Sequence, residues 1–458
     1  MQTVVRTSLG LLVLAALAVS SSAAELAAVR SAAFDYDAYY QQGNADYDGG
    51  SVPALNVSYR SVASDCCEPS CGYDDDCCGD DACCGDPCCG DACGCGAGVG
   101  GGLLSDCCCM GALEGLSLAS LMGLEDSALE IGGWTQLGYH SNTTFGSTAF
   151  DDLLAFNDLP DQVNLHQQWL YLAKAADGSN GFDVGGRIDV MYGTDAQKTQ
   201  AFGNPGAGTR GFGTFDASLD HGYYGWAIPQ LYGEVAMGDL SVIVGHFYTL
   251  VGYEVVPATG NFFYSHALTM FNSEPFTHTG VLATYSGLEA MTLYGGWTAG
   301  WDTGFDSLNS GSSFLGGFGA DLADAVTLTY ICTYGNFGWR DGGADDSYSH
   351  SVVISAGLTD NLEYVFQTDM VNTDDSAGVA YDTVGINQYL FYSLNDVVKL
   401  GGRAEWWKAD GVSYNEVTGG VNVALLDNLV FRPEYRYDWS PGGDIDETTF
   451  GMDMILSY

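Results

Sequence analysis

Residues 429–440, LVFRPEYRYDWS, decide the fold because apolar and charged side chains alternate along them. One face of this stretch carries Leu429, Phe431, Pro433, Tyr435, Tyr437 and Trp439. The other face carries Val430, Arg432, Glu434, Arg436, Asp438 and Ser440. Successive side chains of a strand point to opposite sides, so the stretch predicts a strand with one aromatic face and one charged face. Such a strand suits a barrel wall between lipid and a wet lumen.

The last residues of the chain repeat this pattern. Every second position is apolar, at Phe450, Met452, Met454, Leu456 and the terminal Tyr458. A chain that ends in this way resembles the C-terminal signal of outer-membrane β-barrels. One residue disagrees with a regular ladder, since Pro433 lacks a backbone N–H, and we expect a local bulge there.

Similar segments of about ten residues, separated by turn residues, fill the chain from Leu129 onward. They predict strands at 129–142, 164–175, 182–193, 223–237, 240–250, 277–286, 288–300, 314–323, 326–336, 350–358, 362–373, 383–394, 397–409, 414–425, 429–440 and 448–458. Short connections alternate with long ones at 143–163, 194–222, 251–276, 301–313 and 337–349. The fold class is therefore all-β: a transmembrane antiparallel up-and-down barrel of about 16 strands, within about 14–18. After the N-terminus the sequence has no run of about twenty apolar residues, so it predicts no membrane-spanning helix.

The part before the barrel divides by composition. Residues 1–24 are typical of a secretory signal peptide, with Arg6, an apolar run over 9–19 and small residues before the cleavage site. An uncleaved anchor is the alternative, but the apolar run is short for one. Residues 25–65 read as an acidic linker, and 66–109 as a disordered low-complexity segment rich in Cys, Gly and Asp. Residues 110–128 have rough helical spacing, which predicts a short amphipathic helix at the periplasmic rim or in the barrel mouth; the barrel domain is 129–458.

Fourteen of the 15 cysteines lie in the segment 66–109. They are Cys66, Cys67, Cys71, Cys77, Cys78, Cys83, Cys84, Cys88, Cys89, Cys93, Cys95, Cys107, Cys108 and Cys109. Adjacent cysteines pair poorly with each other, so disulfides to other sites, including envelope cross-links, are the favoured interpretation. A featureless tail and a site for a soft metal stay open as alternatives, although the spacing is unlike a zinc module, and we predict no metal. We expect Cys332 to be a small apolar residue on a strand face.

Several stretches carry a resemblance to a known family. They include IGGWTQLGYH (131–140), PDQVNLHQQWLYLAKAADGSNGFDVGGRIDVMYGTDAQKTQAFGNPG (160–206), LYGGWTAGWDTGFD (293–306) and GGRAEWWKADG (401–411). These stretches resemble the OmpL-like β-barrel porins of planctomycetes, over about 130–458. The resemblance implies an outer-membrane barrel; it names no substrate.

The charge excludes some partners. The net charge of −45 disfavours nucleic acid and anionic headgroups. From Glu130 onward, 40 acidic and 10 basic residues give −30. We find no catalytic motif of the common hydrolase or nucleotide-binding kinds, and predict neither an enzyme nor a cofactor.

The candidate pore residues are charged and share the inward face of their strands. They are Arg187, Asp189, Arg403, Glu405, Arg432, Glu434, Arg436 and Asp438. Rings of charge in a wet barrel set ion preference, whereas cross-strand ion pairs stiffen the wall; the sequence leaves both roles open.

The stretch 260–280, GNFFYSHALTMFNSEPFTHTG, is unusually aromatic for a surface loop. Its candidate constriction residues are Phe262, Phe263, Tyr264, His266, Phe271 and His278. Such a loop should fold against something: either inward, constricting the pore, or against a neighbouring protomer. Its two histidines could nominally serve a hydrolase, but a structural role is the stronger interpretation.

These observations predict an outer-membrane porin for passive diffusion of ions and small hydrophilic solutes, exported to the bacterial outer membrane and able to form a homo-oligomer. We expect cation preference from acidic residues in the long loops, namely Asp151, Asp152, Asp158, Asp161, Asp341, Asp345 and Asp346. The alternative is a structural or adhesive envelope barrel that anchors a cross-linked Cys-rich segment.

Overall fold

The computed structural model describes residues 113, 115–124, 127–142, 156–201, 216, 223–305, 310–338, 347–373, 381–443 and 445–458. Their sixteen strands are β1 (Glu130–His140), β2 (Val163–Lys174), β3 (Phe182–Gly193), β4 (Gly225–Met237), β5 (Leu240–Tyr248), β6 (Thr277–Leu288), β7 (Met291–Thr298), β8 (Ser312–Ala323), β9 (Val326–Asn336), β10 (Ser347–Thr359), β11 (Leu362–Thr373), β12 (Tyr381–Ser393), β13 (Val398–Ala409), β14 (Val412–Leu426), β15 (Leu429–Ser440) and β16 (Ile445–Ser457). The helices are α3 (Leu118–Met122), α5 (Ala196–Thr199) and α6 (Leu268–Ser273), with 3-10 turns η4 (Gly178–Asn180) and η6 (Ala258–Gly260).

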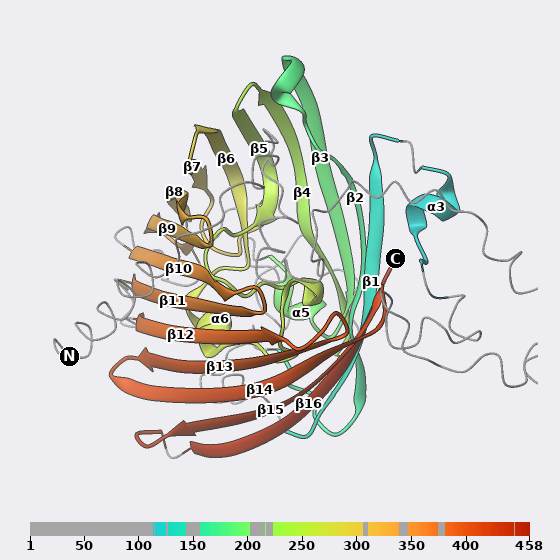
Figure 1. The fold of residues 1–458 in the computed structure, drawn as a ribbon. Helices are drawn as coiled ribbons and strands as arrows, with labels where there is room; N and C mark the ends of the chain where they lie inside the picture. The colour runs from blue at the N-terminus through green and yellow to red at the C-terminus, as the bar shows by residue number, and fades with distance from the viewer. Residues whose placement is uncertain are drawn as a thin grey trace, which may run out of the picture.

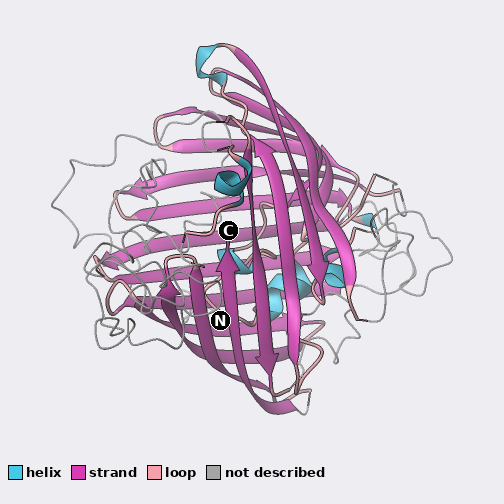
Figure 2. Cartoon of the chain, turned by 90° about the vertical axis from the view of Figure 1, so that its right-hand side faces the viewer, coloured by secondary structure: helices cyan, strands magenta, loops and turns pink. Residues whose placement is uncertain are grey.

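The strands form one closed antiparallel barrel. Each strand pairs with its neighbours in the sequence, and β1 pairs with β16 to close the ring, for example Trp134 with Ser457 and His140 with Gly451 (Figures 1 and 2). Closure leaves no unpaired sheet edge, which lipid could not satisfy. The predicted all-β up-and-down barrel of sixteen strands is confirmed, and the strands at 182–193, 326–336, 362–373 and 429–440 have the predicted bounds.

The alternation along β15 follows the two sides of the wall. Arg432, Glu434 and Arg436 are buried inside the barrel, whereas Tyr435 is 57% exposed on the outside. Apolar side chains on the outside meet lipid, and charged side chains on the inside need partners within the lumen. This arrangement sets up the candidate site.

The bulge expected at Pro433 is wrong. The register between β14 and β15 is the same on both sides of the proline, since Gly420 pairs with Glu434 and Val423 pairs with Phe431. The shift in this pair of strands lies instead between Ala424 and Leu426, beside the turn. A proline removes one donor but keeps an extended backbone, so the strand needs no extra residue to accommodate it.

The helix expected over 110–128 is shorter than predicted. Ser117 caps α3 at its start, and Gly123, with φ +68°, ends it. The helix lies beside β1, outside the ring of strands, with Leu121 and Met122 exposed, so it does not plug the mouth (Figure 1). Among the described residues, no helix is long and apolar enough to cross a membrane. The expected signal peptide (1–24), the expected linker (25–65) and the cysteines of 66–109 lie outside the described residues.

Cys332 lies on β9, where it pairs with Gly316 of β8 and His350 of β10. It has no disulfide partner among the described residues and is partly buried. Its neighbour Tyr334 is 52% exposed, and alternation places both side chains on the outer face.

Candidate functional site: a loop across the lumen

The connection between β5 and β6, residues 249–276, folds into the barrel, and we call it the lumen loop. It contains η6 and α6, and every residue of α6 is buried. Figure 1 shows α6 within the ring of strands, and the helix contacts β11, β12 and β13. The loop therefore crosses from its own strands to the opposite wall.

Glycines in the wall receive side chains of the lumen loop. A Cβ added to Gly401 would lie 2.2 Å from Phe262, one added to Gly420 would lie 3.2 Å from Phe263, and one added to Gly385 would lie 2.5 Å from Thr269. Tyr264 occupies two such positions, at 2.7 Å from a Cβ on Gly138 or on Gly451. These five glycines, which we call sockets, leave the space that the loop fills.

Glutamates of the wall bind the backbone of the loop. Glu434 accepts hydrogen bonds from the N–H groups of Tyr264 at 2.8 Å and Ser265 at 3.1 Å. Glu405 accepts from Leu268 at 2.6 Å and Thr269 at 2.7 Å. The first N–H groups of a helix need outside acceptors, and α6 has no side-chain cap of its own. Glu405 of β13 therefore caps α6 from the barrel wall.

Arginines of the wall bind the carbonyl groups of the same loop. Arg403 donates to the carbonyl of Ser265 at 2.8 Å, and Arg436 to that of His266 at 2.6 Å. Arg432 donates to the carbonyl of Ala258 at 3.0 Å and to that of Asn261. Arginines of the wall thus donate to carbonyl groups of the loop, and glutamates of the wall accept from its N–H groups.

Each of these arginines also has a carboxylate partner. Arg403 binds Glu254 of the loop at 2.7 Å and Glu416 at 2.9 Å. Burial alone would raise the pKa of Glu254, but the adjacent Arg403 guanidinium holds it below its ordinary value. Arg432 pairs with Asp453 at 2.5 Å and Arg436 with Asp438 at 2.8 Å. The positive charges of the three arginines under the loop are therefore neutralised.

The eight predicted pore residues all face inward, but they do not form one ring. Arg403, Glu405, Arg432, Glu434, Arg436 and Asp438 are together beneath the lumen loop, and each is at most 5% exposed. Arg187 and Asp189 pair at 2.7 Å on β3, and Arg187 lies 4.5 Å from the ring centre of Tyr171. Their geometry is that of ion pairs that fix the loop and the wall.

A second anchor, which the sequence did not indicate, joins the loop to β2. The Tyr264 hydroxyl lies 2.7 Å from Nε2 of His166, and Nδ1 of His166 lies 3.0 Å from Asp195. Burial would raise the pKa of Asp195, but the neighbouring His166 lowers it. Tyr264, His166 and Asp195 lie far apart in the sequence, and a single histidine in a strand does not indicate which residue will bind it.

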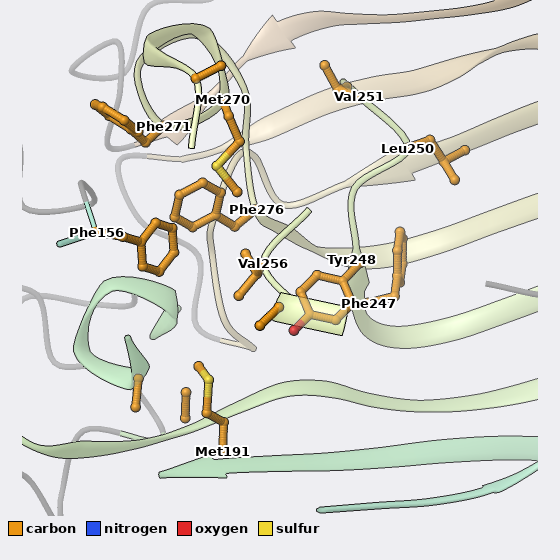
Figure 3. Packing of buried hydrophobic residues seen from close by; sticks show 14 of the residues in the cluster. Phe156, Met191, Phe247, Tyr248, Leu250, Val251, Val256, Met270, Phe271 and Phe276 are labelled. Atoms are coloured by element: carbon orange, nitrogen blue, oxygen red, sulfur yellow. The ribbon is translucent and has the colours of Figure 1, made fainter. Parts of the chain in front are cut away.

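The remaining predicted loop residues are placed as follows. His266 is buried, which lowers its pKa, and its Nε2 lies 3.2 Å from the carbonyl oxygen of Val255. Phe271 and Phe276 join a buried cluster with Phe156, whose ring centre lies 5.6 Å from that of Phe276 (Figure 3). The assignment of His278 to the loop is wrong: it belongs to β6, with Nε2 3.0 Å from the Thr249 hydroxyl. The strand begins at Thr277, the predicted start of the segment 277–286, because its ladder with β5 begins there.

At mid-height the inward-facing side chains are buried almost all the way round. The ring consists of Gln136, Gln167, Met191, Gln230, Ile243, Leu282, Leu315, Ile331, Ser351, Gln367, Asn387, Glu405, Thr418, Glu434 and Asp453. Nearer the short turns, lumen-facing residues such as Tyr294, Thr329 and Ser355 are partly exposed. The lumen loop thus covers the inward face in the middle of the barrel and leaves the inward face near the short turns accessible.

Two of the predicted mouth acids are described. Asp158 pairs with Lys198, and Asp161 is exposed with a positive φ of 62°. Asp151, Asp152, Asp341, Asp345 and Asp346 lie outside the described residues. Groups of three or more His, Cys, Asp or Glu able to hold a metal do not occur in the described part of the chain.

Solved structures of outer-membrane proteins are similar to this barrel. OmpT of Vibrio cholerae, in its trimer form, has 13% identity over 72% of this chain and 99% of that chain, with a TM-score of 0.48. The outer membrane channel DcaP of Acinetobacter baumannii has 11% identity, covers 72% and 97%, and gives 0.49. An anion-selective porin from Comamonas acidovorans has 12% identity, covers 72% and 99%, and gives 0.49. No curated protein matches the chain.

A protein-family comparison matches residues 128–458, which include the whole barrel, to the family described as "Putative beta-barrel porin-2, OmpL-like". This match agrees with the closed ring of sixteen antiparallel strands. The chain therefore belongs to this family of OmpL-like outer-membrane β-barrel porins.

Proposed function

We propose that this porin forms a water-filled channel for passive diffusion of ions and small hydrophilic solutes, and that the lumen loop is its constriction. The observation that carries the proposal is the set of hydrogen bonds from Glu405, Glu434 and Arg403 to the loop backbone. Anchors of this kind hold a narrowing element at mid-height and leave the barrel wall intact. A homo-oligomer is part of the proposal, and the mass of the detergent-solubilised protein would test it.

Cation preference is the second part of the proposal. The four arginines Arg187, Arg403, Arg432 and Arg436 have carboxylate partners and little exposed surface, so they present little positive charge to a passing ion. The barrel region has 40 acidic and 10 basic residues, so negative charge dominates what is left. A negative mouth concentrates cations, most strongly at low ionic strength.

One observation favours a second candidate function. The buried ring at mid-height would also suit a closed barrel that anchors the Cys-rich segment in the envelope as a structural or adhesive protein. A closed anchor conducts no ions, so the same electrical recording separates the two candidates. High-mass species that collapse on reduction in non-reducing gels would support the cross-linking role.

Recording from the full chain in planar bilayers tests the channel. Discrete conductance steps, with a reversal potential of cation sign in a potassium chloride gradient that weakens as salt rises, are expected. The D161N variant removes an exposed mouth charge and should reduce the preference slightly, whereas E289Q, in the turn between β6 and β7, should leave it unchanged. Absence of steps would support the closed anchor, and anion preference at low salt would refute the charge argument.

A further inference from the structure

The outgoing arm of the lumen loop, residues 273–276, meets the wall through carboxylates. Glu274 accepts a hydrogen bond from Gln367 Nε2 of β11 at 2.6 Å, and the same nitrogen donates to Asp369 at 2.6 Å. Glu274 and Asp369 are each 2% exposed. One neutral amide therefore bridges two buried carboxyl groups.

Glu274 is also fixed from the other side. A Cβ added to Gly252, on the incoming arm, would lie 1.9 Å from Glu274 Oε2. The carboxyl group thus lies between the two arms of the loop and β11. It cannot reach water unless the outgoing arm moves away from the wall.

The groups around Glu274 are acidic. Those that face it are Asp369 on β11, Glu254 on the incoming arm, Glu405 on β13 and Tyr389 on β12. Arg403 binds Glu254 and Glu416. Burial, and then the charge of Asp369, raise the pKa of Glu274 well above its ordinary value. Asp369 Oδ1 is buried without a hydrogen-bond partner among the described residues, so an ionised Asp369 would also be poorly stabilised.

We propose that the outgoing arm is a proton-controlled gate: it stays closed while Glu274 and Asp369 share a proton, and it opens when both carboxylates are ionised. The inference deepens the proposed channel function and rests on it. Opening moves the arm away from β11 and uncovers the wall of β8 to β11, whose inward residues include Ser351, Leu315 and Ile331. The rest of the loop stays anchored to β13, β15 and β16.

The direction of the pH effect follows from proton linkage. The closed state holds the proton more tightly than the open state, so closure is fully stabilised below the ordinary carboxyl pKa and is lost as pH rises through the raised value. His266 is buried, and burial lowers its pKa. Above about pH 7 its imidazole is therefore neutral in both the closed and the open channel and contributes no pH dependence to gating there.

Single-channel recording of the full chain between about pH 5 and about pH 9 tests the gate. The ratio of open to closed channels should rise by up to about tenfold per pH unit, since one proton leaves for each opening. The E274Q variant needs no proton and should show a flat response, whereas E289Q should behave as the parent protein. Heat-modifiable gel migration confirms that each variant forms a folded barrel.

A reversible tether gives an independent test. The hydroxyl groups of Ser273 and Thr383 lie 2.7 Å apart, so the double variant S273C/T383C should form a disulfide that holds the arm on β12. Oxidised channels should stay closed at high pH and regain the parent response after reduction, while either single variant should respond throughout. If the conductance of the parent protein does not change with pH, the gate is overturned but the channel is not. The same holds if E274Q keeps the pH response of the parent protein. Absence of conductance at every pH overturns the proposed function and the gate with it.

Discussion

The tip and the outgoing arm of the lumen loop meet the barrel through different chemistry. At the tip, residues 258–269, arginines and glutamates of β13 and β15 bind the loop backbone, and each arginine also has a carboxylate partner. The outgoing arm meets β11 through Glu274, Gln367 and Asp369. A buried charge is stable only with a partner. Arginines lie among the acids at the tip, whereas Glu274 and Asp369 have one neutral amide between them, which is why we place the proposed gate on the outgoing arm. One loop thus has two chemically different contacts with the wall.

The largest effect should follow from removing Arg403. The R403M variant leaves Glu254 and Glu416 buried without their common partner, which should lower the free energy of unfolding by about 3–5 kcal/mol. Denaturant unfolding in detergent measures this loss. R187M, which breaks one same-strand pair beside Tyr171, should cost clearly less. Equal losses would remove the distinction between the anchored tip and the rest of the wall.

A blocked socket should have the next largest effect. In G401V the new side chain overlaps Phe262, and overpacking of this kind costs about 1–3 kcal/mol. The neighbouring Gly402 has open space where its Cβ would lie, so G402V is a matched control and should be nearly neutral. Proteolysis of the folded barrel, which would cut a displaced loop, gives a second measurement. Similar behaviour of the two variants would contradict the socket.

A charge on the outer face affects assembly and not the loop. L456D places a carboxylate on the lipid-facing side of β16, which should cost up to about 2 kcal/mol and reduce insertion into vesicles. Spin labels at 435 and 436 should report lipid-like and water-shielded surroundings respectively, since Tyr435 is exposed and Arg436 is 1% exposed. Equal accessibility at the two sites would reject the register of β15.

The smallest effect should come from the anchor on β2. Y264F removes the hydroxyl that meets His166 but keeps the ring against Gly138 and Gly451, so about 1 kcal/mol should be lost. Y264A also empties both sockets and should cost several times more. Thermal or denaturant unfolding of the pair separates the hydrogen bond from the packing.

The sequence predicted the wall better than its contents. Alternation of apolar and polar residues is local, so all sixteen strands between 129 and 458 could be found, although several bounds differ by a few residues and the bulge expected at Pro433 was wrong. The part of the wall that the loop contacts could not be predicted, because residues in contact, such as Tyr264 and Glu434, lie 170 positions apart in the sequence. A socket such as Gly401 is indistinguishable in sequence from the outward-facing Gly402 beside it. The charged residues were predicted to face inward, but their partners depend on which part of the wall the loop contacts.

The central claim is that the lumen loop is bound to the inner wall, and hydrogen exchange tests it most directly. The N–H groups of Tyr264, Ser265, Leu268 and Thr269 donate to Glu434 and Glu405 inside the barrel. In detergent micelles these four amides should exchange as slowly as amides in the middle of β13 and β15, and E405Q should speed exchange at Leu268 and Thr269 more than at Tyr264. Exchange at the rate of an exposed surface loop would contradict the account.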